Sequence, residues 1–205
     1  PGKAEVAAVV AKLTGKVAEA TEPKYAHIKC RGGNGIAKLA YEYKGVHDCA
    51  AAKIVQQGPK FCKFGCLGFG NCTRACPFGA MSMGENGLPV VNKTLCTGCG
   101  KCASVCPNHV IELLPISAKV SISCSSKDFG APAMKNCKAP CLGCGSCMRN
   151  CSHQEEGAIK IIDHLAVVNQ DICHTCDNAT CLTKCPTGAI NEMIKGSFKK
   201  EENVG

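Results

Sequence analysis

The 205-residue chain combines 20 cysteines with only 4% aromatic residues, no tryptophan and a formal net charge of +8. Its length and its regular cysteine spacing exclude a small secreted scaffold held by disulfides, and no signal peptide opens it. No apolar stretch approaches the roughly 20 residues that span a bilayer, and the basic residues are scattered, which argues against a nucleic-acid surface.

Residues 1–58 are predicted to form an N-terminal extension with a helix and a strand. Valine and leucine recur at helical spacing, so residues 3–20 are expected to form an amphipathic helix packed on the rest of the protein. Residues 25–30 alternate like a half-buried strand that ends in Cys30, and Cys49 follows later in the extension. The glycine-rich loop at residues 31–35 lacks a nucleotide-binding pattern and is interpreted as a turn.

Residues 59–115 carry two cysteine runs and are predicted to be one ferredoxin unit. The second run, with its x2, x2 and x3 spacings and a final Cys-Pro, is the arrangement by which bacterial ferredoxins bind [4Fe-4S] clusters. The first run is a looser version of it. Residues 80–83 and 88–91 flank a Gly-Glu-Asn-Gly turn and predict a hairpin. The two runs are Cys62, Cys66, Cys72, Cys76 and Cys96, Cys99, Cys102, Cys106.

Residues 139–192 repeat this pattern as a second unit. A hairpin is expected from residues 158–162 and 165–168. Residues 116–138 are predicted to connect the units with a strand and a loop, and residues 193–205 form a tail. The cysteine runs of this unit are Cys141, Cys144, Cys147, Cys151 and Cys173, Cys176, Cys181, Cys185.

Equal spans suggest how the sixteen motif cysteines are shared. Cys62 to Cys106 and Cys141 to Cys185 are both 44 residues, which indicates a duplicated unit. In ferredoxins the last cysteine of each run ligates the other cluster. The predicted ligand sets are therefore Cys62, Cys66, Cys72, Cys106; Cys76, Cys96, Cys99, Cys102; Cys141, Cys144, Cys147, Cys185; and Cys151, Cys173, Cys176, Cys181.

Four cysteines remain outside the motifs, namely Cys30, Cys49, Cys124 and Cys137. Residues 119–124 alternate as residues 25–30 do, and both segments end in a cysteine. If the two strands pair, the four thiols converge on one site. A set of four thiolates suits a fifth cluster or zinc, and free or disulfide-bonded thiols remain an alternative.

The predicted fold class is thus α+β, with tandem bacterial-type two-[4Fe-4S] ferredoxin domains behind an N-terminal extension. An oxidised cluster with its four thiolates carries about −2, so that four clusters offset the basic excess. All-cysteine ligation predicts potentials near roughly −400 mV, and N–H groups of glycines flanking the cysteines are expected to point at the sulfurs. Those glycines are Gly65, Gly98, Gly100, Gly143 and Gly145.

We expect no catalytic site in this chain. Neither a flavin nor a nicotinamide fold is indicated, and the six histidines are scattered singly. His174, between Cys173 and Cys176, is the one histidine expected to modulate a cluster through a hydrogen bond.

Longer stretches resemble one family closely. Residues 41–51 (YEYKGVHDCAA), 60–72 (KFCKFGCLGFGNC), 76–80 (CPFGA) and 87–91 (GLPVV) are similar to the B subunit of the Rnf electron-transport complex. The resemblance covers nearly the whole chain, including the four extra cysteines. One departure is Ser152, where the family usually has proline after the cysteine.

The resemblance implies an electron-transfer subunit of an ion-translocating ferredoxin:NAD oxidoreductase. Its donor is then soluble ferredoxin, its partners are other redox subunits, and it is cytoplasmic and peripheral at the cell membrane. Members of the family normally carry an N-terminal membrane helix and a further cysteine-rich segment, which we expect to precede Pro1. Alternatives are the iron–sulfur small subunit of a molybdenum or tungsten oxidoreductase and, from a different class, a metal-storage protein.

Overall fold

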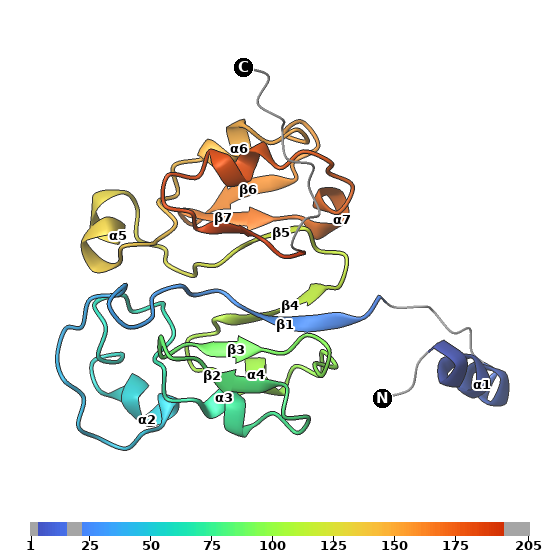
Figure 1. The fold of residues 1–205 in the computed structure, drawn as a ribbon, viewed down its shortest axis with the longest axis horizontal. Helices are drawn as coiled ribbons and strands as arrows, with labels where there is room; N and C mark the ends of the chain where they lie inside the picture. The colour runs from blue at the N-terminus through green and yellow to red at the C-terminus, as the bar shows by residue number, and fades with distance from the viewer. Residues whose placement is uncertain (1–3, 16–21, 195–205) are drawn as a thin grey trace.

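The computed structural model describes residues 4–15 and 22–194, and residues 22–194 form two stacked layers (Figure 1). One layer is built from the first half of the chain and the other from the second. The first layer contains β1 (Lys24–Ile28), α2 (Cys49–Ile54), α3 (Asn71–Arg74), β2 (Met81–Met83), β3 (Pro89–Val91), α4 (Lys101–Ser104) and β4 (Ile111–Pro115). The second contains β5 (Val120–Ile122), α5 (Ala131–Asn136), α6 (Ser146–Arg149), β6 (Ile159–Ile162), β7 (Leu165–Val168), α7 (Gln170–Cys173), α8 (Thr180–Thr183) and β8 (Ile190–Glu192).

Helix α1 (Ala4–Thr14) stands apart from both layers (Figure 1). The helix was expected over residues 3–20, of which residue 3 and residues 16–20 lie outside the described part. Its apolar side chains were expected to pack on the protein, but Leu13 is 81% exposed and Val9 58%. Amphipathic periodicity predicts a helix with an apolar face and does not say what that face meets.

Every sheet in the described residues has two antiparallel strands. In each layer the first strand pairs with the last. β1 pairs with β4, and β5 pairs with β8. The predicted strands are present, but the pairing of residues 25–30 with residues 119–124 is wrong. Each of these strands instead pairs with the strand that follows the last cysteine of its own layer. β1, which was predicted to belong to a separate extension ending at residue 58, is therefore part of the first layer. β5, which was predicted to lie in the connecting segment, is part of the second layer.

The two predicted hairpins are confirmed. β2 pairs with β3 through a turn in which Gly87 has φ +71°, and β6 pairs with β7 through Asp163 and His164. Asp163 and His164 have φ +49° and +62°, which are the values that a two-residue type I′ turn demands. Mixed short helices and strands agree with the predicted α+β class and with a ferredoxin-like fold.

Polar contacts join the layers where β1 and β5 face each other. The Ser125 hydroxyl donates to the Lys29 carbonyl oxygen (2.9 Å), and the Ser123 hydroxyl lies 3.4 Å from His27 Nε2. Burial lowers the pKa of His27, which favours a neutral imidazole in this contact. No helix in the described residues is both long and apolar enough to cross a bilayer.

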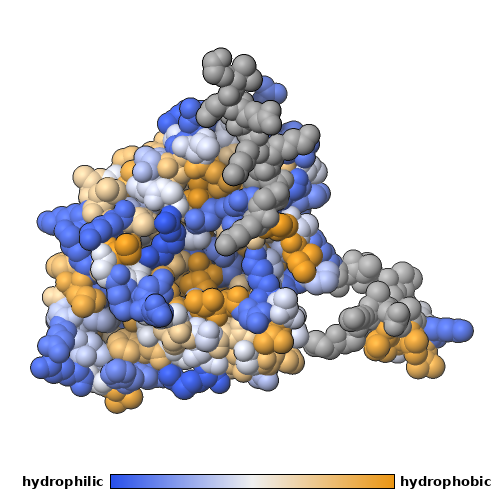
Figure 2. Space-filling view, viewed as in Figure 1, coloured by the Kyte–Doolittle hydropathy of each residue, from blue (hydrophilic) through white to orange (hydrophobic). Residues whose placement is uncertain are grey.

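Apolar side chains are shared between a small interior and the surface. Figure 2 shows apolar residues (orange) interspersed with polar ones (blue) over the visible face. The larger buried clusters contain several cysteines among apolar residues such as Val110, Val120 and Ile159. Many of the thiols are therefore core residues, and any group that they bind would be part of the packed interior.

Candidate iron–sulfur cluster sites

Four one-turn helices present cysteines in the same way. Each of α3, α4, α6 and α8 has a buried cysteine at its second residue and another cysteine two residues beyond its last. Three of these helices begin after a glycine in the left-handed region, which turns the preceding loop sharply into the helix. The cysteine pairs are Cys72 and Cys76, Cys102 and Cys106, Cys147 and Cys151, and Cys181 and Cys185.

In the second layer the structure brings together both predicted quartets. One cavity is lined by Cys141, Cys144, Cys147 and Cys185, here called the Cys147 set. Four thiols act on Cys181 electrostatically: Cys151, Cys173 and Cys176, and more weakly Cys147, which lines the first cavity. We call Cys181 and the first three the Cys181 set. Ser152, which departs from the family pattern, has its hydroxyl 3.3 Å from Cys176 Sγ.

In the first layer the structure also brings together one of the predicted quartets. Cys76, Cys96, Cys99 and Cys102, the Cys102 set, line a cavity between α4 and the β2–β3 hairpin. The backbone N–H of Ala26 points at Cys96 Sγ, 3.4 Å away. Thr97 Oγ1 is buried in the same cavity wall without a protein hydrogen-bond partner. An orphaned hydroxyl beside four thiols suits a cavity filled by a group that accepts hydrogen bonds.

The remaining quartet of the first layer differs from the prediction. The cavity holds Cys49, Cys66, Cys72 and Cys106, here called the Cys72 set, and Cys62 does not line it. The Cys66-x5-Cys72 loop lacks the middle cysteine of a ferredoxin run, and α2 supplies a thiol from elsewhere in the chain. Among neighbouring thiols, Cys49 acts most strongly on Cys72.

Cys62 lies instead between the layers, with the cysteines left outside the motifs. One cavity is lined by Cys30 and Cys62 from the first layer and by Cys124 and Cys137 from the second; we call these four the bridging set. The predicted fifth site had Cys49 in place of Cys62. Gly65 is part of the same wall, and a Cβ atom on it would lie 3.5 Å from both Cys30 Sγ and Cys62 Sγ.

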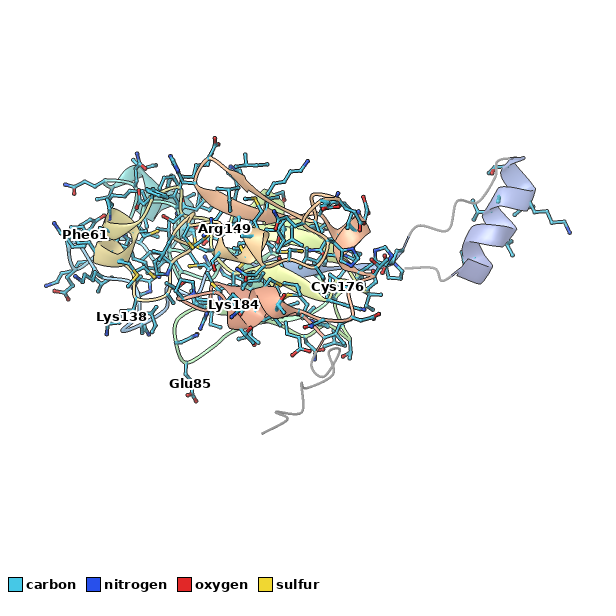
Figure 3. The ribbon with its side chains drawn as sticks, turned by 90° about the horizontal axis from the view of Figure 1, so that it is seen from above. Phe61, Glu85, Lys138, Arg149, Cys176 and Lys184 are labelled. Atoms are coloured by element: carbon cyan, nitrogen blue, oxygen red, sulfur yellow. The ribbon has the colours of Figure 1, made fainter. Side chains whose placement is uncertain are left out.

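Residues 36–40 position the bridging set. The Lys38 N–H donates to Asn136 O at 3.0 Å, which fixes the segment that carries Cys137. Lys38 O in turn accepts from the N–H of Phe61, the residue before Cys62, also at 3.0 Å. In the view from above, Phe61 and Lys138 lie toward the end of the molecule opposite α1, and Cys176 lies nearer α1 (Figure 3).

A sequence signal for this regrouping exists. Cys62-x3-Cys66 has the same spacing as Cys137-x3-Cys141, so that Cys66, and not Cys62, corresponds to Cys141. The equal 44-residue spans pointed to the other alignment, because the loop between Cys66 and Cys106 is four residues shorter than its counterpart (40 against 44).

Backbone N–H groups surround the bridging thiols in a related pattern in both layers. Cys30 Sγ accepts from the N–H groups of Cys66 and Gly32 at 3.3 and 3.4 Å. Cys124 Sγ accepts from Ser126 at 3.4 Å, and a Cys141 N–H acts on it too. Gly65, predicted to donate to a sulfur, does so to Cys62. Such donors favour the thiolate that a cluster requires.

Burial has the opposite effect on several of the thiols. It raises the pKa of Cys66 and Cys181 to about 12 and that of Cys72, Cys124, Cys147 and Cys173 to about 11. At Cys185 burial is outweighed by N–H donors from Ile190 and Thr187, and its pKa is lowered. Thiols that resist ionisation in a dry interior become stable as thiolates once a metal centre takes up their charge.

The arrangement of the thiols suits a group larger than one ion. All twenty cysteines lie within the described residues, and none of them forms a disulfide. No three Cys, His, Asp or Glu side chains of the described ranges converge closely enough to hold a single metal ion. Sixteen of the thiols line four cavities, with four thiols at each.

The comparisons with known proteins agree with this chemistry. The 4Fe-4S dicluster domain family matches residues 65–111. The B subunit of a proton-translocating ferredoxin:NAD(+) oxidoreductase complex from Clostridium ljungdahlii is 51% identical over 99% of this chain and 70% of its own length. The B subunit of an ion-translocating oxidoreductase complex from Methanosarcina acetivorans is 40% identical over 92% of this chain and 70% of its own length.

A third relative, the B subunit of a Na(+)-translocating ferredoxin:NAD(+) oxidoreductase complex from Acetobacterium woodii, is 37% identical over 95% of this chain and 57% of its own length. Identity at this level extends over nearly the whole chain, whereas the cysteine motifs account for only a few short segments of it. The chain belongs to the family of B subunits of ion-translocating ferredoxin:NAD(+) oxidoreductase complexes, the Rnf complexes.

Proposed function

We propose that this chain conducts low-potential electrons from reduced ferredoxin to partner redox subunits through five [4Fe-4S] clusters, one at each cysteine set. A cluster of this type takes up and releases one electron without further chemistry. The observation that carries the proposal is the cavity between the layers, to which Cys30 and Cys62 come from one layer and Cys124 and Cys137 from the other.

The cysteine spacings arrange the five sets in series. Cysteines four residues apart join neighbouring sets. On the one-turn helices four residues rise about 6 Å, whereas the Cys62–Cys66 and Cys137–Cys141 segments, which join the bridging set to its neighbours, are loops. Cys102 and Cys106 join the Cys102 set to the Cys72 set, and Cys147 and Cys151 join the Cys147 set to the Cys181 set. The bridging set is joined to the Cys72 set by Cys62-x3-Cys66 and to the Cys147 set by Cys137-x3-Cys141.

This order makes the bridging set the connection between the layers. Without it, each layer is a separate two-cluster ferredoxin unit, as the sequence predicted. Neighbouring clusters joined by one turn lie roughly 10 Å apart, by helix rise plus thiolate bonds, which is close enough for rapid tunnelling. Cys99 in the first layer and Cys144 in the second are exposed, so that a partner can approach a cluster on either layer.

Membership of the family supports the remaining parts of the proposal. The relatives are named as subunits of ferredoxin:NAD(+) oxidoreductase complexes. We assign ferredoxin as the donor, the neighbouring redox subunits as acceptors, and a peripheral position at the cytoplasmic face of the membrane. The molybdenum-type alternative pairs the first motif with the last, whereas here each outer strand pair closes a single layer.

Paired cysteine variants test both the number of sites and their ligands. Cys49→Ala combined with Cys72→Ala removes two ligands of one set, so that about 16 of about 20 iron atoms remain at four per cluster. Cys62→Ala combined with Cys72→Ala damages two sets and leaves about 12. Iron and sulfide are measured in anaerobically purified protein, with EPR spectra of the reduced samples.

The grouping predicted from sequence requires the reverse result, about 12 iron atoms for the first pair and about 16 for the second. That result would show that Cys62, and not Cys49, belongs with Cys72. A wild-type content of about 16 iron atoms would remove the bridging cluster from the proposal altogether.

A further inference from the structure

Lys60 is a buried cation with no anionic partner. The residue is only 7% exposed, and it is the one charged residue among the buried residues of the described ranges. Its Nζ donates to the carbonyl oxygens of Gly32 and Cys66, both at 2.7 Å. None of the ion pairs in the described part of the chain involves Lys60.

The ammonium group lies between two of the cysteine sets. Lys60 lines the cavity of the bridging set, and its hydrogen-bond acceptor Cys66 is a member of the Cys72 set. Burial raises the pKa of the Cys66 thiol to about 12, and the charge of Lys60 opposes that effect by favouring the thiolate. The ammonium therefore acts on cysteine ligands directly.

Backbone hydrogen bonds hold Lys60 in this place. The Ala40 N–H donates to Pro59 O (2.7 Å) and the Phe61 N–H to Lys38 O (3.0 Å), so that Lys60 is fixed between them opposite Leu39. The same segment, residues 36–40, also positions Cys137. Residues 36–40 thus hold both the Lys60 ammonium group and the bridging set in place.

A buried ammonium that meets only neutral acceptors is costly, because carbonyl dipoles replace the lost water incompletely. A cluster with four thiolates carries about −2 when oxidised and about −3 when reduced. Each added electron is therefore attracted by a fixed positive charge nearby, and the reduced form gains more than the oxidised form. In a dry cavity this attraction is weakly screened.

We propose that Lys60 is a positioning residue whose fixed charge raises the reduction potential of the bridging cluster and of the Cys72 cluster, making the crossing between the layers easier to reduce. The inference rests on the proposed function and adds to it a residue that controls electron entry at the bridge. Lys60 touches ligand residues and does not itself bind iron.

Replacement by methionine removes the charge and keeps the length of the side chain. In Lys60→Met the reduction equilibrium of the bridging cluster should shift at least ten-fold toward the oxidised form, which corresponds to about 59 mV for one electron. EPR-monitored redox titration of the anaerobic full chain measures the shift, and Cys124→Ala identifies the bridging signal as the one that disappears. Lys138→Met, beside Cys137 but exposed, is the matched control and should leave the titration unchanged.

Two further variants separate charge from hydrogen bonding and packing. Lys60→Gln keeps a donor without the charge, and should titrate as Lys60→Met does. A wild-type potential in Lys60→Met or Lys60→Gln at full iron content would overturn the inference. If both assemble fewer clusters, Lys60→Arg decides: full iron content shows that the charge is required, and a deficit shows a packing role and overturns the inference. Failure of the proposed function is distinct, because wild type itself would then lack the bridging signal.

Discussion

At the scale of single residues, two glycines allow the chain to pass closely beside a cysteine loop. Gly98 and Gly143 occupy corresponding positions of the two layers and have φ +67° and +64°. A Cβ atom at Gly98 would overlap Lys24 O, at the start of β1, and one at Gly143 would lie 2.5 Å from His164 O. Both positions therefore need glycine for space as well as for backbone conformation.

Gly98→Ala should lower the stability and the iron content of the Cys102 set by more than the strain of a left-handed alanine alone would. A left-handed alanine costs roughly 1–2 kcal/mol, and overlap with a backbone carbonyl adds to this because β1 has to shift. Gly79→Ala is the matched control, since Gly79 has φ +59° and open space around it. Iron content and thermal unfolding should be affected more in Gly98→Ala, and equal effects in the two variants would show that the close approach is unimportant.

At the scale of elements, α2 acts as a support for one thiol. Asp48 caps the helix by accepting from the Ala51 N–H at 2.9 Å, and Asn71 of α3 accepts from the Cys49 N–H at 2.9 Å. The Asn71 side chain also donates to Asp48 Oδ2 at 2.6 Å. The hydrogen bond from Ala51 and the one from Asn71 lower the pKa of Asp48, so that the carboxylate stays ionised. Two short helices are thereby locked together around Cys49 and Cys72.

Replacement of Asn71 should loosen Cys49 without removing a ligand. Asn71→Ala is expected to speed iron release to a chelator about five-fold, the factor for one net hydrogen bond of about 1 kcal/mol. Asn71→Asp places a carboxylate beside Asp48 and raises the pKa of the pair. Its release, relative to wild type at the same pH, should therefore slow as the pH falls from about 7.5 to about 5.5 and the pair takes up a proton, with the Arg74 guanidinium beside both carboxylates moving this change toward lower pH. Wild-type rates in both variants would show that α2 is held by other contacts.

At the scale of the whole molecule, cysteines supply about a third of the buried apolar residues in the described part of the chain. Cysteines make up much of both main clusters, and large apolar side chains such as Phe61 and Phe129 remain about half exposed. Short two-stranded sheets are marginal by themselves and need further packing. Metal centres substitute for a core in small domains, and we expect them to do so here.

Removal of iron should therefore unfold both layers. Protein stripped of iron and sulfide anaerobically is expected to lose cooperative thermal unfolding and the amide protection of β1, β4, β5 and β8, and reconstitution should restore both. Circular dichroism and hydrogen exchange measure these changes. Retained protection in the stripped protein would mean that the apolar residues suffice.

Much of this organisation was predictable, because ligand spacing is a local property. One-turn helices with cysteines four residues apart, the two hairpins and both quartets of the second layer follow from motifs that are contiguous in the chain. Strand pairing was not predictable in the same way. Alternation marks residues 25–30 and 119–124 as strands, but says nothing of their partners, which lie beyond the last cysteine of each layer.

By itself the sequence determined the kind of chemistry, the α+β class and the family, and it predicted thiol groupings that the structure brings together in part. Only the tertiary structure placed Cys49 in one cavity with Cys72, and Cys62 in another with Cys30, Cys124 and Cys137. It also revealed the buried charge of Lys60 between two of these sets. The physical reason is distance along the chain: α2 and the crossing between the layers bring together residues tens of positions apart, and no local spacing encodes such contacts.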